Sequence, residues 1–118
     1  MNNSNQALKV VKGFFEAINK GDFEEASGFM SSEHVYEGPM FSTNNPTDYF
    51  EMLSKFEMEF AVETLDLIAA DNFVTHVSIL KVLSPVQAEI PCCEVFDIVE
   101  GKITKQRFFF DTSLFPAP

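Results

Sequence analysis

The sequence predicts an α+β fold in which three N-terminal helices pack on one face of a strongly curved antiparallel sheet. Up to Phe56, apolar residues recur at the three- and four-residue spacing of amphipathic helices. After Phe56, four long segments rich in β-branched and aromatic residues follow, separated by turn residues. The chain has 118 residues, 46% of them hydrophobic and 14 of them Phe. This predicts a single domain over residues 1–118 with a substantial core.

The first helix is predicted over residues 5–20. Ser4 is a suitable N-cap for it, and Gly21 a suitable residue to end it. Apolar side chains at helical spacing form its predicted buried face: Leu8, Val10, Val11, Phe14, Phe15, Ala17 and Ile18.

Two shorter helices are predicted next. Asp22 is placed to cap the second helix, with Glu25 three residues later as in a capping box. The residues of this helix predicted to face inward are Phe23, Ala26 and Met30. An extended piece over residues 34–41 separates it from a third helix that starts at Asn45 and Pro46. The buried stripe of the third helix is predicted to be Tyr49, Leu53 and Phe56.

Four segments are predicted to form the sheet: residues 60–70, 73–84, 87–100 and 102–112. The turns between them are short, so neighbouring strands must pair antiparallel. Each segment is roughly twice as long as a common strand of about five or six residues. Long antiparallel strands twist and coil, so the sheet is expected to curve strongly.

The charge balance argues against nucleic-acid and membrane partners. The net charge is −10 and no basic cluster occurs, so a phosphate backbone would be repelled. The apolar runs are too short to span a membrane, and the N-terminus lacks the features of a signal peptide, which predicts a cytoplasmic protein. Cys92 and Cys93 are adjacent and point to opposite faces of a strand, so neither a disulfide nor a metal site is predicted.

Three stretches in this order, FFEAINKGDFEEA, HVYEGP and FDIVEGKITKQRFFFD, resemble the nuclear transport factor two-like superfamily. The resemblance covers nearly the whole chain and is to the SnoaL-like polyketide cyclase and ketosteroid isomerase-like branch. It implies one cone-shaped domain with a pocket between the curved sheet and the first helix. In this superfamily the pocket is catalytic in some members and only binds a ligand in others.

The stretch RFFFD suggests one wall of such a pocket. Strand alternation sets Arg107, Phe109 and Asp111 on one face, with the two charges roughly 13 Å apart. The same pattern also fits a strand whose ends are solvated. The resemblance implies an acid/base role for Asp111, and a cap or turn role is the alternative. Under the first interpretation, Asp111→Asn abolishes turnover without unfolding the protein.

Two glutamates are further catalytic candidates. Glu37 precedes a Gly-Pro turn, and the resemblance to ketosteroid isomerases implies that it is the general base; an exposed loop glutamate is the alternative. Glu94 shares a strand face with apolar residues, where a charge is costly. The resemblance implies that Glu94 is a protonated acid that donates to a ligand oxygen. A salt bridge across the sheet is the alternative for Glu94.

The helix-one tyrosine of ketosteroid isomerases is matched here by Phe14, which cannot donate a hydrogen bond. This departure argues against steroid isomerase activity, and Tyr36 and Tyr49 are the candidate substitutes. His76 lies in mid-strand and is either a structural residue or a catalytic proton carrier. His34 is predicted to be exposed.

Eight residues are predicted to contact the ligand: Phe14, Phe15, Tyr36, Met40, Tyr49, Phe96, Arg107 and Phe109. Three functions stay open at this point. The first is a cofactor-free enzyme that isomerises, enolises or cyclises an apolar carbonyl-containing small molecule. The second is a non-catalytic binding module for such a ligand. The third is a homodimeric interaction protein that uses the outer sheet face, and dimerisation is compatible with both other functions.

Overall fold

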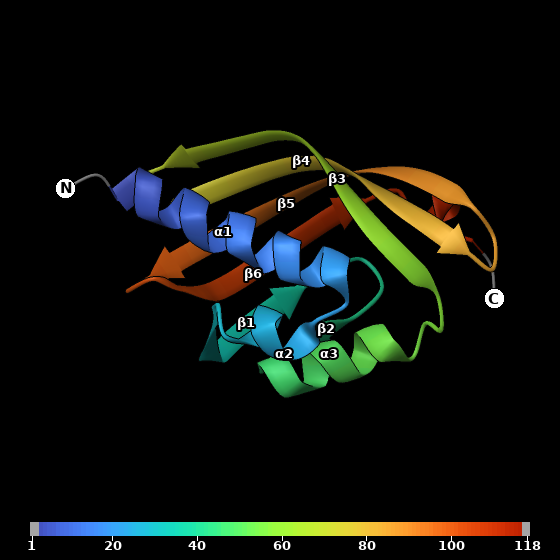
Figure 1. Ribbon diagram of the computed structural model, residues 1–118, viewed down its shortest axis with the longest axis horizontal. Helices are drawn as coiled ribbons and strands as arrows, with labels where there is room; N and C mark the ends of the chain where they lie inside the picture. Colours follow the sequence, from blue (N-terminus) through green and yellow to red (C-terminus); the bar gives the residue numbers. More distant parts are fainter. Residues whose placement is uncertain (1–2, 117–118) are drawn as a thin grey trace.

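A computed structural model of the chain describes residues 3–116 (Figure 1). The helices are α1 (Asn3–Lys20), α2 (Phe23–Ser27), α3 (Pro46–Ser54) and a short 3-10 helix, η1 (Thr112–Leu114). The strands are β1 (Met30–Glu37), β2 (Ser42–Thr43), β3 (Glu59–Ala70), β4 (Phe73–Ser84), β5 (Ala88–Val99) and β6 (Lys102–Phe110). The predicted α+β class is therefore confirmed. None of the helices within residues 3–116 is long and apolar enough to cross a membrane.

The strands form one open, curved sheet in the order β2-β1-β6-β5-β4-β3. The three strands from β3 to β5 each have twelve residues, and they bend across the molecule as expected for long antiparallel strands (Figure 1). Neighbouring strands pair antiparallel except β1 and β6, which pair in parallel. The parallel pair brings the early segment beside the last strand, and this places residues distant in sequence at one site.

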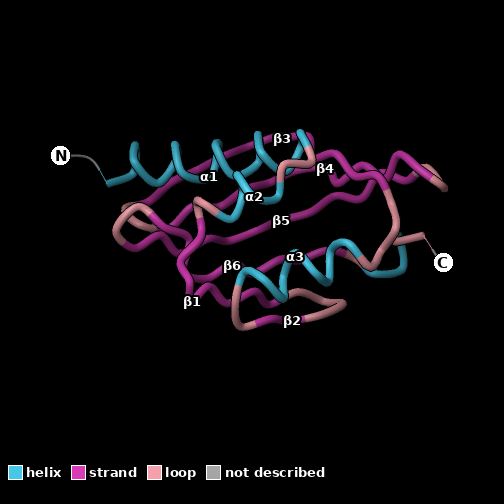
Figure 2. The backbone as a smooth tube through the Cα atoms, turned by 60° about the horizontal axis from the view of Figure 1, so that its bottom comes forward, coloured by secondary structure: helices cyan, strands magenta, loops and turns pink. Residues whose placement is uncertain are grey.

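The helices cover the two flanks of the concave face rather than its centre. Helix α1 packs on β3 and β4, while α3 packs on β1 and β2 (Figure 2). Two of the predicted caps are confirmed, because Asp22 accepts a hydrogen bond from the backbone N–H of Glu25 and Asn45 accepts one from that of Asp48. Ser4, predicted to cap the first helix, instead lies within α1, which already includes Asn3. This arrangement leaves the inner surface of β5 and β6 partly uncovered between the two helices.

The main core lies under α1. Val11 and Phe14 of α1 are buried against Phe96, Ile98 and Ile103 of the last two strands. A smaller buried cluster lies where β4 ends and β5 begins. It consists of Val82, Ile90 and Cys92. The hollow of the molecule lies between these two packed regions.

Several local predictions need correction. The second helix ends at Ser27, and Met30 instead starts β1, four residues before the predicted extended piece. The third helix ends at Ser54, so Phe56 lies beyond it. His34 was expected to be exposed, but it is fully buried because β1 pairs with β6 and the ring packs against Tyr49.

Strict alternation also fails in β6. The pairing of β5 with β6 shifts register between Asp97 and Ile98, and both Ile103 and Gln106 are buried. From Gln106 onward the even-numbered residues face the core side. Phe109 is therefore 54% exposed on the outer face.

Candidate functional site

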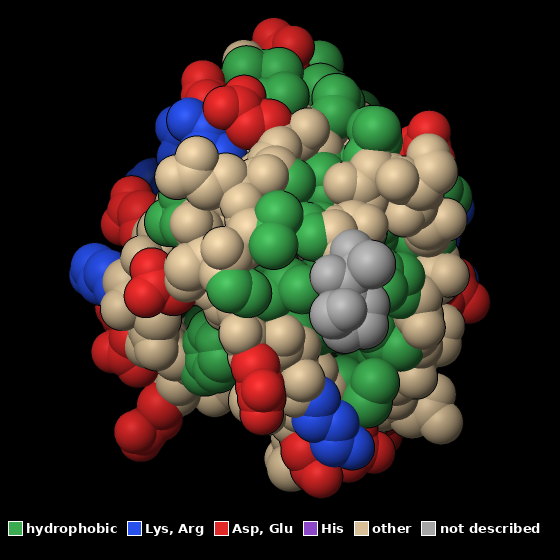
Figure 3. Space-filling model, turned by 90° about the vertical axis from the view of Figure 1, so that its right-hand side faces the viewer, with side chains coloured by type: hydrophobic (Ala, Val, Ile, Leu, Met, Phe, Trp, Pro, Cys, Tyr) green, Lys and Arg blue, Asp and Glu red, His purple; other side chains and the backbone are tan. Residues whose placement is uncertain are grey.

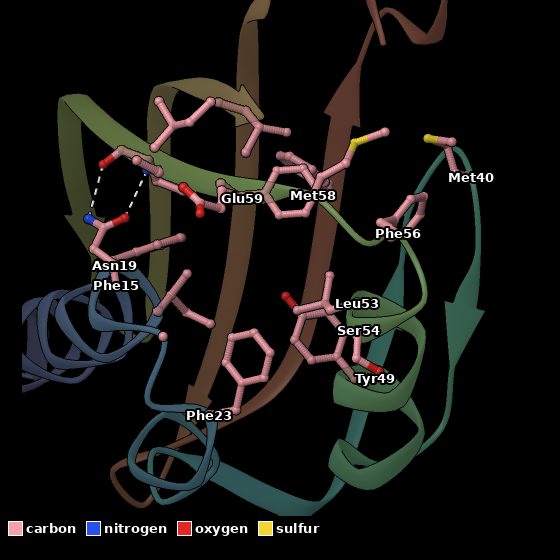
Figure 4. Close-up of a pocket in the computed structure, with 18 of the residues that line it drawn as sticks. Phe15, Asn19, Phe23, Met40, Tyr49, Leu53, Ser54, Phe56, Met58 and Glu59 are labelled. Atoms are coloured by element: carbon pink, nitrogen blue, oxygen red, sulfur yellow. Dashed lines mark hydrogen bonds between the residues drawn. The ribbon is translucent and has the colours of Figure 1, made fainter. Parts of the chain in front are cut away.

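A cavity of about 800 Å³ lies between the end of α1, helix α3 and the inner face of the sheet. Its walls are mostly aromatic and aliphatic, a usual setting for a small-molecule site. In Figure 4, Tyr49 and Leu53 from α3 face Phe15 and Phe23 across the cavity. The cavity is also lined by Phe14, Tyr36, Met40, Glu94, Phe108 and Phe110.

The segment that joins α3 to β3 also lines the cavity. Phe56 and Met58 of this segment and Glu59 at the start of β3 are among the lining residues (Figure 4). Asn19 at the end of α1 both donates to and accepts from the backbone of Val62 in β3, at 3.1 and 2.8 Å. On this end of the molecule, apolar side chains gather near the centre and most charged side chains lie toward the periphery (Figure 3). The largely aromatic and aliphatic lining of the cavity therefore favours an apolar ligand.

Glu94 is the buried carboxyl group of the cavity wall. It comes from β5, is 5% exposed, and accepts a 2.6 Å hydrogen bond from Nε2 of Gln106 at its Oε2 atom. Burial raises the pKa of Glu94 to about 7, and the bond from Gln106 opposes that rise. None of the ion pairs in the described part of the chain involves Glu94, so the salt-bridge alternative is not observed.

Gln106 connects Glu94 to two further polar groups. Its Nε2 atom also donates to the hydroxyl of Tyr49 at 3.3 Å, and its Oε1 atom lies 3.0 Å from Nε2 of His34. Sequence reasoning missed Gln106 and His34 as site residues. A polar amide among phenylalanines on the inner side of the last strand was the available signal for Gln106.

Tyr36 and Tyr49, for which the sequence predicts a contact with the ligand, both line the cavity. Burial raises the pKa of both hydroxyls above the ordinary value, so both keep their protons at neutral pH. The hydroxyl of Tyr49 accepts from Gln106, and no hydrogen bond found among residues 3–116 uses the hydroxyl proton of either tyrosine. Both tyrosines can therefore donate to a ligand oxygen.

Two of the predicted catalytic carboxylates lie outside the cavity. Asp111 is exposed and caps η1, where it accepts hydrogen bonds from the N–H and the hydroxyl of Ser113. These bonds lower the pKa of Asp111. Glu37 is exposed and lies 3.6 Å from Nζ of Lys105. The expectation that both look into the cavity is corrected, because β6 ends before Asp111 and β1 turns Glu37 outward.

The remaining predicted residues divide between the wall and its backing. Phe14, Phe15 and Met40 line the cavity, whereas Phe96 and His76 lie behind it. Phe96 packs edge-on against the rings of Phe14 and Phe15. His76 is fully buried, packs on Phe15 with ring centroids 4.2 Å apart, and is hydrogen-bonded to the hydroxyl of Thr64 at 2.8 Å.

The RFFFD stretch does line the cavity, but with the opposite phase to that predicted. Phe108 and Phe110 point to the cavity, while Arg107 and Phe109 do not line it. The shift of register between Ile103 and Lys105 explains the change of phase. In the described part of the chain, no three His, Cys, Asp or Glu side chains gather closely enough to hold a metal ion.

Comparison with known families gives a match over almost the whole chain. The model of the limonene-1,2-epoxide hydrolase catalytic domain matches residues 5–116. The chain belongs to this family. The resemblance to the nuclear transport factor two-like superfamily is thereby confirmed, because this domain is one of its members. No match is found among curated proteins.

Solved structures support the same fold. An LEH-like epoxide hydrolase from M. tuberculosis aligns with a TM-score of 0.83 at 22% identity, over 94% of this chain and 86% of that one. An NTF2-like protein of unknown function from Cytophaga hutchinsonii gives 0.80 at 20% identity, over 91% of each chain. A protein with a ketosteroid isomerase-like fold from Catenulispora acidiphila gives 0.80 at 12% identity, over 89% and 87%. At these identities the similarity concerns the fold alone.

Proposed function

We propose that this protein is a cofactor-free acid–base enzyme that isomerises, enolises or cyclises an apolar carbonyl-containing small molecule. The observation that carries the proposal is Glu94, a buried carboxyl with a pKa of about 7 in the wall of a largely apolar cavity. A group that titrates near neutral pH is both a competent base and a competent acid there. The volume of about 800 Å³ is suited to a ligand of several fused or linked rings.

In this mechanism Glu94 carries the proton and the tyrosines hold the substrate oxygen. Ionised Glu94 takes the proton from the carbon next to the carbonyl group and later returns it, at the same or a different carbon. Tyr36 and Tyr49 donate hydrogen bonds to the oxygen, which gains negative charge as the proton leaves. They replace the donor that Phe14 cannot supply.

Epoxide hydrolysis is the second candidate, and the family match favours it. Here protonated Glu94 donates to the epoxide oxygen while water adds to a ring carbon. The water's extra proton then returns to the carboxylate. The same apolar cavity and the same carboxyl serve both reactions.

Two assays separate the candidates. Enolisable apolar ketones are incubated in deuterated buffer and followed by proton NMR for exchange, and apolar cyclic epoxides are followed for diol formation. Glu94→Gln should lower the active reaction by about 100-fold or more, since positioned acid–base groups contribute about 10²–10⁴-fold. Glu63→Gln, an exposed glutamate paired with Lys81, is the matched control. Full activity in Glu94→Gln would refute the catalytic role.

A binding module without chemistry is the remaining alternative. Apolar ketones that raise the melting temperature but show neither exchange nor conversion would support it. Asp111→Asn belongs in the same series, because its exposed position predicts activity within about twofold of wild type. Loss of turnover in that variant would instead restore Asp111 as a catalytic residue.

We further propose that the protein forms a homodimer through the outer face of the sheet. Large apolar side chains stand exposed on the strands there, including Ile68, Phe73 and Phe109. Such a face is stabilised when a second copy covers it. Sedimentation velocity should give a dimer for wild type and a monomer for Phe109→Lys. A wild-type monomer at high micromolar concentration would contradict the proposal.

A further inference from the structure

A chain of buried polar side chains leads from Glu94 away from the cavity. Gln106 is 1% exposed and His34 is 0% exposed, and neither lines the cavity. The links are the 2.6 Å bond from Gln106 to Glu94 and the 3.0 Å contact between Gln106 and His34. Polar groups this deeply buried act on the chemistry only through their neighbours, so the order of donors and acceptors along the chain matters.

The amide of Gln106 has a direction. An ionised carboxylate can only accept hydrogen bonds, so the NH₂ group of Gln106 must face Glu94. The same NH₂ group donates to the hydroxyl of Tyr49. Oε1 of Gln106 then faces His34 and requires a donor, which is the N–H of His34 Nε2.

The surroundings of His34 hold this tautomer. Its Nδ1 atom is buried and has no hydrogen-bond partner among residues 3–116. The other tautomer would place an N–H at Nδ1 with no acceptor, a defect that folded proteins rarely contain. Burial also lowers the pKa of His34, which keeps the ring neutral with one proton.

We propose that His34 is the positioning residue of this site: its Nε2–H donates to Oε1 of Gln106 and so holds the amide with its NH₂ group toward Glu94. If the amide turned over, Oε1 would face Glu94 and would accept a hydrogen bond from the protonated acid. His34 thus sets which protonation state of Glu94 the protein favours. The link to catalysis rests on the proposed function, whereas the hydrogen-bond order does not.

The other groups around Glu94 offer no competing explanation for its charge state. Three titratable groups lie near Glu94: Tyr36 from β1, Tyr49 from α3 and Cys92 from β5. Each has a raised pKa and is therefore neutral near pH 7, so none places a charge beside Glu94. His76 is the partner of Glu94 in the register of β4 and β5, but its Nε2 is bonded to Thr64. Helix α1 presents Phe14 and Phe15, which carry no charge.

Carboxyl-carbon NMR of the ligand-free protein tests the proposal, with the Glu94 signal assigned by its loss in Glu94→Gln. His34→Phe keeps a ring but removes the donor, so the amide can turn and hold the protonated acid. The pKa of Glu94 should rise by about one unit, a tenfold change in its protonation equilibrium. His34→Gln retains an N–H donor on a side chain of similar length and should bring the pKa back to within about 0.3 units of wild type. His76→Phe is the matched control, a buried histidine outside the chain, and should leave the pKa of Glu94 in place.

Two results would overturn the proposal. One is an unchanged pKa of Glu94 in folded His34→Phe, and the other is an equal shift in His34→Gln. If His34→Phe does not fold, imidazole-nitrogen NMR of the wild-type protein decides, because the proposal requires the Nε2–H tautomer and the Nδ1–H tautomer contradicts it. None of these measurements needs a substrate. A shifted pKa together with full activity of Glu94→Gln would therefore reject the proposed function and leave the role of His34 standing.

Discussion

Glu94 and His76 are partners on neighbouring strands, yet they have opposite relations to the cavity. Their Cα atoms are paired in the register of β4 and β5, and both side chains are buried on the concave face. Burial moves both toward the neutral form: the pKa of Glu94 rises to about 7 and that of His76 falls to about 4. A shifted pKa alone therefore does not distinguish the catalytic candidate from the structural one.

Access to the cavity makes the difference. Phe15 covers His76 with its ring, and Thr64 occupies the Nε2 atom. Glu94 lines the cavity, and no hydrogen bond among the described residues uses its Oε1 atom. The ring of His76 is therefore fully engaged by its neighbours, whereas Glu94 has an oxygen that can bind a ligand. Desolvation supplies the unusual acidity in both places, but only the open site can use it.

The pH dependence of stability gives the largest test of this comparison. The pKa of Glu94 is raised from 4.5, so its stabilising contribution is complete below pH 4.5 and is lost as the pH rises through about 7. The pKa of His76 is lowered from 6.5 to about 4, so the unfolded chain binds more protons between these values and stability rises with pH there. The two effects oppose each other between pH 4.5 and 6.5.

When one of the two groups is removed, the pH dependence of the free energy of unfolding should show the contribution of the other. Relative to wild type, Glu94→Gln should gain about 3 kcal/mol in free energy of unfolding as the pH rises from 4.5 to 7. His76→Phe should lose about 3 kcal/mol relative to wild type between pH 4 and 6.5. Urea unfolding at a series of pH values measures both differences. If the free energy of unfolding of both variants followed the same pH dependence as wild type, burial would not shift the pKa of either group. Glu63→Gln is the control, and its pH dependence should match that of wild type in either case.

Most helices and strands, and the position of Glu94 in the site, could be predicted from the sequence. The caps at Asp22 and Asn45 follow from local hydrogen-bonding chemistry, which is why they could be predicted. Glu94 was predicted as a polar residue on an apolar strand face, since burial alternates regularly along the whole of β5. These features depend on residues close together in the chain, and local rules are sufficient for them.

The rest of the site depends on pairings that local rules do not contain. His34 and Gln106 are 72 positions apart and meet because β1 and β6 pair in parallel. The four predicted strands were all antiparallel, so this contact had no place in the expected sheet. Phe109 and Asp111 were placed on the pocket side because alternation was counted through an irregularity of the β5–β6 pair. A shift of one residue exchanges the two faces of a strand.

The smallest expected effect concerns the bond that closes the His76 site. Thr64→Val keeps the shape of the side chain but removes the hydroxyl that pairs with Nε2 of His76. Because Thr64 lies at an exposed position, water can replace part of the lost bond, and the cost should be about 1 kcal/mol. Thr75→Val, on the outer side of β4, controls for the loss of a strand hydroxyl as such. If His76 is structural, Thr64→Val lowers the free energy of unfolding while enzyme activity and the pKa of Glu94 stay at wild-type values. A fall in activity of tenfold or more, at equal folded fraction, would mean that the His76 site is coupled to the cavity. His76 would then not be a purely structural neighbour of Glu94.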